Sequence, residues 1–344
     1  MTPETERFIW VLQGARAGDN AQARELAAKL GWKVLVKPLS FNLLHLLPNV
    51  LLGAGVASLK GQAAATLAPP WPDLVIAPGK RTAPVARWIK KRSGGKSKIV
   101  QIGRPRARLS AFDLVVTTPQ YGLPGAKNVV ENLLPFATPR QPDPGTIDKW
   151  SSSWSRLPRP WIALAVGAPR FPLQLKDVDI GRLAKAASDL AIALNGSLIV
   201  LGSPRTAAGM VGKIGGRLRG PASLHPWNTA DNPYQSALAL ADRFIVTSDS
   251  ASMIGEAVRT GKPVEIFILP SSKLNLSWRA AAGLGAWLSR QGILQPPRDM
   301  SRLLEEIIAR GHARPLGSGI ATRPMSGRVG DDIVARIKAM FENS

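Results

Sequence analysis

Short apolar runs bounded by glycine or proline recur through the first 120 residues of the chain. Each run holds about five residues rich in Val, Ile and Leu, without the polar alternation of a half-exposed strand. Continuous apolar runs that alternate with helical patterns are typical of parallel strands buried on both faces of a sheet. The predicted strands are Phe8–Leu12, Lys33–Lys37, Asp73–Ala77, Lys98–Ile102 and Asp113–Thr117.

The same pattern restarts after Pro135–Pro160, a segment rich in Pro, Ser and Trp with little periodicity, where we place a domain boundary. The strands predicted beyond it are Trp161–Val166, Ser197–Leu201, Phe244–Thr247 and Pro263–Ile268. The predicted helices are Asp179–Leu194, Asn232–Ala241 and Ser250–Thr260.

This order of elements predicts an α/β fold of two Rossmann-like, doubly wound domains. The predicted domains are residues 1–145 and 155–326. An amphipathic helix at Arg328–Phe341 is expected to return to the first domain, which therefore also takes in residues 327–344. Ligands bind at the carboxyl ends of parallel strands in such folds, so we expect the two domains to face a central cleft.

The chain is strongly basic, with 45 Lys and Arg against 23 Asp and Glu and a formal net charge of +22. The extreme segment is Lys80–Arg108, which contains eleven Lys or Arg and no acidic residue. Such an excess predicts a polyanionic partner: a membrane surface, a phosphorylated small molecule or nucleic acid. Nucleic acid is disfavoured because no helix-turn-helix and no aromatic platform accompanies the basic residues. The chain has no cysteine, which excludes disulfides, thiolate zinc sites and a cysteine nucleophile.

One stretch, Phe41–Leu59, is long and apolar enough to consider for a membrane. Asn42, His45 and Asn49 interrupt it, together with a proline, so it is a poor spanning helix. It fits either a surface element that dips into a bilayer or a buried helix-turn. The chain opens without a secretory signal, so we expect a cytoplasmic protein.

Polar and glycine residues follow several predicted strands of the first domain. The loop Gly14–Asn20 offers backbone N–H groups, and Asp19 in it is a candidate catalytic base. The alternative is a glycine loop with a capping residue that serves folding alone. The candidate acceptor- or anion-binding residues are Gly14, Arg16, Gly18, Asn20, Lys80, Arg81 and Arg104.

The second domain carries the sharper signal, a loop of small residues that opens the helix predicted at Ser250–Thr260. Glu256 on that helix can accept hydrogen bonds from both hydroxyls of a ribose, and Ser250 and Ser252 can hold a diphosphate. The alternative is that Ser250 is a helix cap and Glu256 a solvated residue. The candidate donor-binding residues are Gly167, Arg170, Ser203, Arg205, Thr206, Ser248, Asp249, Ser250, Ser252, Met253 and Glu256.

Two features that could suggest a metal are interpreted otherwise. Asp177 and Asp179 form an Asp-x-Asp triplet just before a predicted helix, where aspartate is expected for capping. His45, His225 and His312 are scattered without ligand spacing. We therefore predict no bound metal. The loop glycines lack the spacing of a dinucleotide fingerprint, and no cofactor is predicted.

Four segments together resemble one known family, the mitochondrial fission ELM-type proteins of plants and bacteria. They are VLQGARAGDNAQARELAAKLG, PDLVIAPGKRTAPVARWIKKR, QIGRPRARLSAFDLVVTTPQY and FIVTSDSASMIGEAVRTGKPVEIF. The resemblance implies a GT-B glycosyltransferase-like fold whose second domain holds the donor. The last segment is similar to the Ser-x-x-x-Glu loops of lipid-acceptor transferases such as the GlcNAc transferase of peptidoglycan synthesis.

The residues and the resemblance together predict an inverting, metal-independent glycosyltransferase. Its expected partners are a nucleoside diphosphate sugar, a membrane lipid or lipopolysaccharide acceptor, and an anionic membrane surface, with no nucleic acid. The expected location is the inner face of the cytoplasmic membrane, as a peripheral protein. The alternative prediction is a non-catalytic membrane-associated scaffold of the fission type.

Overall fold

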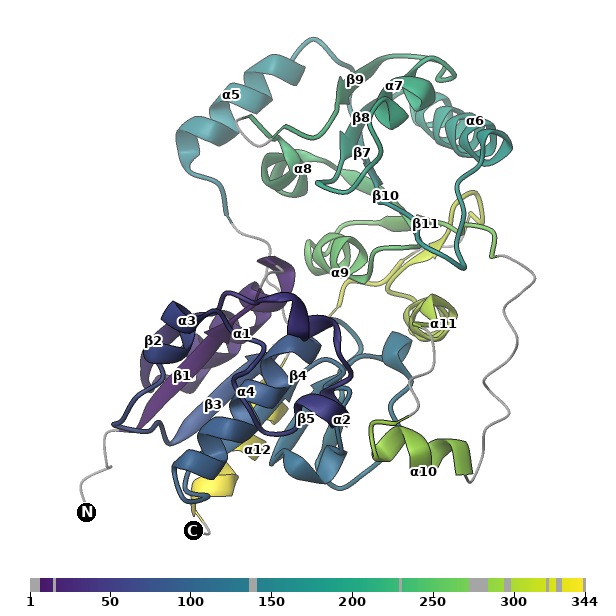
Figure 1. Ribbon diagram of the computed structural model, residues 1–344. Coiled ribbons are helices and arrows are strands. Elements are labelled where there is room, and N and C mark those ends of the chain that lie inside the picture. The colour runs from purple at the N-terminus through teal and green to yellow at the C-terminus, as the bar shows by residue number, and fades with distance from the viewer. Residues whose placement is uncertain are drawn as a thin grey trace. The chain divides into compact units, whose positions relative to one another are not determined.

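The chain folds into two compact α/β units, each built on one parallel sheet (Figure 1). The first unit contains β1–β6, α1–α4, α10 and α12, and the second contains β7–β12, α5–α9 and α11. The computed structural model describes residues 7–14, 17–135, 141–228, 231–271, 284–293, 298–319, 322–325 and 330–342.

The first unit has six strands in the order β2-β1-β3-β4-β5-β6, with every neighbouring pair parallel. Its strands are β1 (Phe8–Gln13), β2 (Lys33–Pro38), β3 (Leu74–Pro78), β4 (Lys98–Ile102), β5 (Leu114–Thr117) and β6 (Val129–Glu131). Its helices are α1 (Ala17–Leu30), α2 (Asn49–Leu52), α3 (Gly61–Ala65), α4 (Gly79–Arg92), α10 (Leu284–Arg290) and α12 (Asp331–Glu342), with short 3-10 turns η1 (Leu43–Leu46), η2 (Leu109–Ala111) and η3 (Pro119–Tyr121).

Both faces of the first sheet are covered at β1, β3, β4 and β5, which are apolar on both sides. The edge strand β2 differs from the prediction of a buried strand, since its Val34, Leu35 and Val36 are exposed. Along β1, Ile9 and Val11 point into the core under α1 and α12, whereas Trp10 and Leu12 point into the core under α4. The C-terminal helix α12 therefore returns to the first unit, as predicted.

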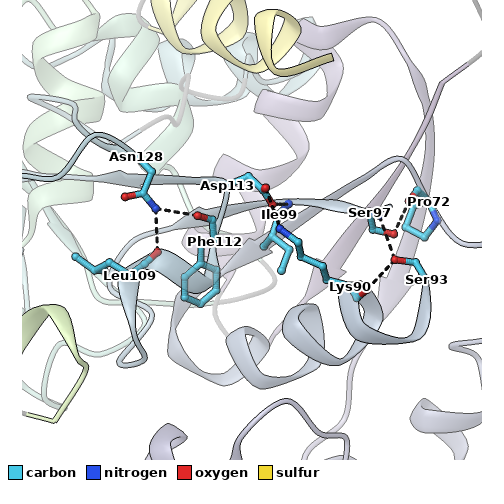
Figure 2. A network of polar contacts seen from close by, with 9 residues as sticks. All are labelled: Pro72, Lys90, Ser93, Ser97, Ile99, Leu109, Phe112, Asp113 and Asn128. Atoms are coloured by element: carbon cyan, nitrogen blue, oxygen red, sulfur yellow. Dashed lines mark hydrogen bonds and ion pairs between the residues drawn. The ribbon is translucent and has the colours of Figure 1, made fainter. Parts of the chain in front are cut away.

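A network of polar contacts ties α4, β4 and η2 of the first unit to the residues just before β5 and β6 (Figure 2). The Asp113 carboxylate accepts from Lys90 Nζ at 2.7 Å and from a backbone N–H of β4 at 2.7 Å. The Asn128 amide donates to the carbonyls of Leu109 and Phe112 at 2.9 and 2.8 Å. These contacts fix the far end of the loop that follows β4.

The second unit has six strands in the order β12-β11-β10-β7-β8-β9, again parallel throughout. Its strands are β7 (Trp161–Val166), β8 (Ser197–Gly202), β9 (Ala222–His225), β10 (Arg243–Thr247), β11 (Val264–Phe267) and β12 (Arg314–Pro315). Its helices are α5 (Pro144–Trp154), α6 (Asp177–Ala193), α7 (Met210–Gly215), α8 (Tyr234–Leu240), α9 (Ala251–Arg259) and α11 (Met300–Ala309).

The nine predicted strands are all present, and the two sheets confirm the predicted α/β class. Two segments differ from the prediction. The predicted boundary segment contains α5, whose Trp150 and Trp154 are buried in the second unit. In addition, α10 and the residues after it belong to the first unit although they fall within the predicted second domain, because Gly292 packs on the backbone of Ala107 and Asp299 N–H donates to the carbonyl of Gln120.

Candidate functional site

In each sheet the order of strands reverses once, between β1 and β3 in the first unit and between β7 and β10 in the second. At such a point the connections leave toward opposite faces of the sheet, and the crevice at the strand carboxyl ends is where open α/β sheets bind ligands. The residues at these ends are Gly14 and Gly79 in the first unit and Gly167 and Ser248–Ser250 in the second. Both crevices therefore coincide with predicted site residues.

In the second unit, Thr247 and Asp249 hold the end of β7. Gly167 N–H donates to Thr247 Oγ1 at 2.8 Å, and the Thr247 hydroxyl donates to Asp249 Oδ1 at 2.7 Å. Burial raises the pKa of Asp249, and hydrogen bonds from Thr247 and Ala168 together with the charge of Arg205 oppose that rise. A Cβ on Gly167 would collide with the Asp249 carboxylate, so this position requires glycine. Asp249 thus holds the loop after β10 against the end of β7.

The loop after β8 is fastened to the same strand end. The Thr206 hydroxyl donates to the carbonyl of Val166 at 2.8 Å and accepts from Ser203 N–H at 2.7 Å. The Ser203 hydroxyl contacts the same Thr206 oxygen at 2.8 Å. The structure therefore brings Ser203, Thr206 and Gly167 together, as the predicted site requires.

A pocket of about 440 Å³ opens where these two loops meet. Its lining includes Gly167, Met210 and two cationic residues, Lys176 and Arg205. Pockets of this size accommodate a nucleotide-sized ligand, and paired cations at its wall suit phosphate groups. Lys176 was not among the predicted residues, because it lies just before α6, far along the chain from the end of β7.

The loop after β10 leads into α9 with most of its side chains already engaged. Ser250 caps α9, its Oγ accepting from Met253 N–H at 3.5 Å. Ser248 is buried and accepts from Leu269 N–H at 3.0 Å. Met253 is buried, whereas Ser252 is exposed. The capping alternative is therefore correct for the Ser250 side chain, and the α9 N-terminus still presents N–H groups.

Glu256 has a partner that the sequence did not indicate. The Tyr234 hydroxyl, from the start of α8, donates to Glu256 Oε2 at 2.6 Å. Burial raises the pKa of Glu256, while the Tyr234 hydrogen bond and the charge of Arg259 lower it. Glu256 is thus a partly buried, oriented carboxylate, so the alternative of a solvated helix residue is wrong.

Arg170 and the two aspartates of the Asp-x-Asp triplet form none of the contacts described above. Arg170 is exposed on the loop after β7. The Asp-x-Asp triplet serves the start of α6, as predicted: Asp179 accepts from Lys176 N–H at 3.0 Å, and Asp177 pairs with Arg217. Across the described ranges no group of three or more His, Cys, Asp and Glu is arranged to hold a metal.

In the first unit, α1 begins earlier than predicted. It starts at Ala17, so Asp19 and Asn20 lie in its first turn and not in a loop. Asn20 holds the backbone of Gly14 by two hydrogen bonds, of 2.9 and 2.8 Å. Gly18 is exposed, and Arg16 lies outside the described residues.

Asp19 lies beside the start of α4. A Cβ on Gly79 would be 3.2 Å from Asp19 Oδ2, and Gly79 has φ +73°, which favours glycine. Lys80 and Arg81 stand in the first turn of α4, where the helix dipole disfavours cations. Two cations and a carboxylate therefore gather where β1 and β3 end. Because the helix dipole disfavours Lys80 and Arg81 at this end of α4, a bound anion would stabilise both cations.

Arg104 follows β4 and is buried, with one of its guanidinium N–H groups donating to the carbonyl of Tyr121. Its side chain lies over the Tyr121 ring, 5.4 Å from the centroid. Burial, with Arg106 and Arg298 nearby, lowers the pKa of Arg104 to about 10. The predicted anion-binding arginine is thus part of a larger cationic cluster.

The apolar stretch Phe41–Leu59 forms an outward-facing surface of the first unit. Leu43, Leu46 and Leu51 are 80%, 66% and 73% exposed on η1 and α2. Its polar residues point inward instead: Asn42 donates to the carbonyls of Ala57 and Leu59, and Asn49 is buried. The buried helix-turn alternative is therefore wrong. We call the exposed residues Leu43, Leu44, Leu46, Leu47, Val50 and Leu51 the leucine patch.

None of the helices within the described ranges is long and apolar enough to cross a bilayer.

Two solved structures are similar in fold to this chain. The MnaA–UDP co-structure from S. aureus has a TM-score of 0.50 and 14% identity, covering 98% of this chain and 97% of that one. A putative UDP-N-acetylglucosamine 2-epimerase from Listeria monocytogenes has a TM-score of 0.51 and 12% identity, covering 98% of each chain. These likenesses and the two parallel sheets show a fold of the GT-B class.

Within that class, the chain belongs to the mitochondrial fission ELM1 family, whose model matches residues 17–309. Mitochondrial fission protein ELM1 of Arabidopsis thaliana is 30% identical over 244 residues, 63% of this chain and 56% of the plant protein. The uncharacterized protein RP120 of Rickettsia prowazekii is 28% identical over 298 residues, 76% of this chain and 84% of that protein. The chain thus spans little more than half the length of the plant relative. The family resemblance of the four sequence segments is confirmed.

Proposed function

We propose that this chain is a glycosyltransferase that moves a sugar from a nucleoside diphosphate sugar to a membrane lipid or lipopolysaccharide precursor, with inversion. The observation that carries the proposal is the pocket at the ends of β7 and β8, with Lys176 and Arg205 in its wall. The S. aureus protein of similar fold was solved with UDP, which supports a uridine nucleotide as the donor. In this proposal the second unit holds the donor and the first unit the acceptor.

Donor binding divides between two features of the second unit. Lys176 and Arg205 bind the diphosphate together with N–H groups at the start of α9. Glu256 accepts hydrogen bonds from the ribose hydroxyls. The charge that develops on the leaving diphosphate is neutralised by these cations and the helix N-terminus, so the proposed reaction proceeds without a divalent metal.

Binding of UDP is expected to raise the unfolding temperature of the protein. At a UDP concentration a hundred times Kd, the native state gains about 2.7 kcal/mol by mass action. We expect the shift to persist in EDTA. Arg205→Gln should reduce it strongly, whereas Arg310→Gln, which removes an equal charge just after α11, should not. Absence of any shift with nucleoside diphosphates, or a shift that needs magnesium, would contradict the proposed donor site.

The leucine patch supports the proposed acceptor and the proposed location. Exposed leucines of 66% to 80% are unusual on a protein surface and cost free energy in water. Between Glu25 and Asp113 the sequence has one acidic residue, Asp73, so the charge around the patch is positive. An apolar surface within a basic one matches an anionic membrane. We propose that the protein docks peripherally there, on the inner face of the cytoplasmic membrane.

Replacing Leu43, Leu46 and Leu51 together with Ser is expected to abolish flotation with anionic vesicles. If the bilayer buries half of each side chain, at roughly 0.8 kcal/mol apiece, loss of all three lowers partitioning about fiftyfold. High salt should release much of the wild-type protein, because each Lys or Arg near the surface contributes about 1 kcal/mol that salt screens.

The matched control replaces Val178 and Ile192 with Ser, two exposed apolar residues of the second unit. These substitutions should leave flotation intact. Equal recovery of the wild-type protein with neutral and anionic vesicles, or no recovery with either, would refute the docking surface.

A non-catalytic membrane scaffold is the second candidate function, favoured by the same leucine patch and by the fission role in the family's description. A protein that acts only as a scaffold would still bind vesicles, but UDP would not stabilise it against unfolding. The unfolding measurement above therefore separates the two functions.

A further inference from the structure

Two arginines of the first unit lie against one tyrosine ring, and a third lies near one of them. Arg104 lies 5.4 Å from the centroid of Tyr121, and Arg298 lies 5.8 Å from the same centroid. Arg106 is close enough to Arg104 to depress its pKa, as Arg298 does. We call Arg104, Arg106 and Arg298 the arginine cluster. Three positive charges held close together favour the binding of an anion.

The backbone around the cluster is built to keep these side chains together. Arg106 adopts φ +51°, a left-handed conformation that is uncommon outside glycine and that marks functional sites when a structure enforces it. A Cβ on Gly292 would lie 2.6 Å from the Ala107 backbone, so Gly292, just after α10, approaches this loop as closely as glycine permits. Asp299 N–H donates to the carbonyl of Gln120 at 2.8 Å, which holds the backbone next to Arg298 beside Tyr121.

The arginine cluster adjoins the leucine patch. Asn49, the first residue of α2, donates to the carbonyl of Pro105 at 2.6 Å and to the carbonyl of Lys80 at 2.7 Å. One buried amide therefore joins three segments: the patch helix, the arginine loop and the first turn of α4. The chain thus fixes an apolar surface directly beside a group of cations.

We infer that the arginine cluster is a binding site for the phosphate or diphosphate headgroup of a lipid whose hydrocarbon chain lies against the leucine patch. Guanidinium groups form paired hydrogen bonds to phosphate oxygens, and a phosphate among three of them relieves their mutual repulsion. That this lipid is the acceptor of sugar transfer rests on the proposed function. The site itself would bind the lipid phosphate without it.

The test is calorimetric titration of the full chain with inorganic pyrophosphate, farnesyl diphosphate and farnesol. We expect farnesyl diphosphate to bind at least tenfold more tightly than pyrophosphate, and farnesol not measurably. Arg106→Asn and Arg298→Gln should each weaken farnesyl diphosphate binding tenfold or more. Asparagine tolerates positive φ, which protects the loop in the first variant. Leu51→Ser should weaken farnesyl diphosphate binding and leave pyrophosphate binding unchanged.

The matched control is Arg92→Gln, an exposed arginine at the end of α4 that lies outside the cluster. An equal loss of affinity in this variant would overturn the inference in favour of general charge attraction. Equal affinity for pyrophosphate and farnesyl diphosphate would overturn the lipid assignment. UDP binding is measured in parallel: its absence alone contradicts the donor site, whereas loss of lipid phosphate binding alone contradicts the arginine cluster.

Discussion

Glu256→Ala is expected to weaken the binding of UDP by about a hundredfold or more. Two charge-assisted hydrogen bonds to ribose hydroxyls, at roughly 1.5 to 2.5 kcal/mol each, contribute about 3 to 5 kcal/mol together. The variant also leaves the Tyr234 hydroxyl without its 2.6 Å acceptor. Isothermal titration with UDP measures the effect, and an unchanged Kd would exclude Glu256 from the donor site.

Tyr234→Phe is the control for this assignment, since it leaves the carboxylate in place. The Tyr234 hydroxyl stabilises the charged form of Glu256, against burial, which raises the pKa of that carboxyl. Removing the hydroxyl raises the Glu256 pKa further. UDP affinity of this variant should therefore approach the wild-type value at alkaline pH, and should fall on acidification at a higher pH than in the wild type.

The strands in the interior of both sheets were predictable because parallel strands covered on both faces must be apolar at every position. The strands that the sequence did not indicate are β6, β9 and β12, of three, four and two residues, and all three lie at sheet edges. An edge strand this short is defined by its neighbour's hydrogen bonds, and its own residues carry no pattern.

The candidate sites were predictable as far as strand-end loops reveal them. Gly167, Thr206 and Arg205 follow strands, so their position in the chain already indicated a shared sheet edge. Tyr234 contacts Glu256, which lies 22 positions later in the chain, and Arg298 contacts Tyr121, which lies 177 positions earlier. Nothing local to either residue signals such a partner, because the packing of the whole unit brings the two side chains together.

The sequence left two interpretations of Phe41–Leu59 open, and the structure shows a surface element. Asn42 and Asn49 interrupt the apolar stretch, and they argue correctly against a spanning helix. In the structure both amides bond inward to backbone carbonyls, and the leucines turn outward. This arrangement is the reverse of a protein core, and it supports the proposed membrane-docking surface.

Asp19→Asn is expected to reduce turnover by about 10² to 10⁴ while leaving UDP binding intact. The reason is the position of the carboxylate at the strand-reversal crevice of the first unit, in the first turn of α1 and beside Gly79. A general base there would take the proton of the acceptor hydroxyl as it attacks the sugar. The amide keeps the shape of the side chain but cannot accept that proton. Release of nucleoside diphosphate from a nucleotide sugar, in the presence of membrane lipids, measures the rate.

The matched control is Glu25→Gln, which removes one carboxylate from the same helix, about two turns further along. It should retain the wild-type rate, because Glu25 lies away from the crevice end of α1. Thermal unfolding of both variants separates a catalytic effect from a structural one, since Asp19 also contacts the start of α4 through Gly79. If Asp19→Asn lowers stability or UDP affinity and the rate falls only in proportion, Asp19 positions these two helices and another group removes the proton.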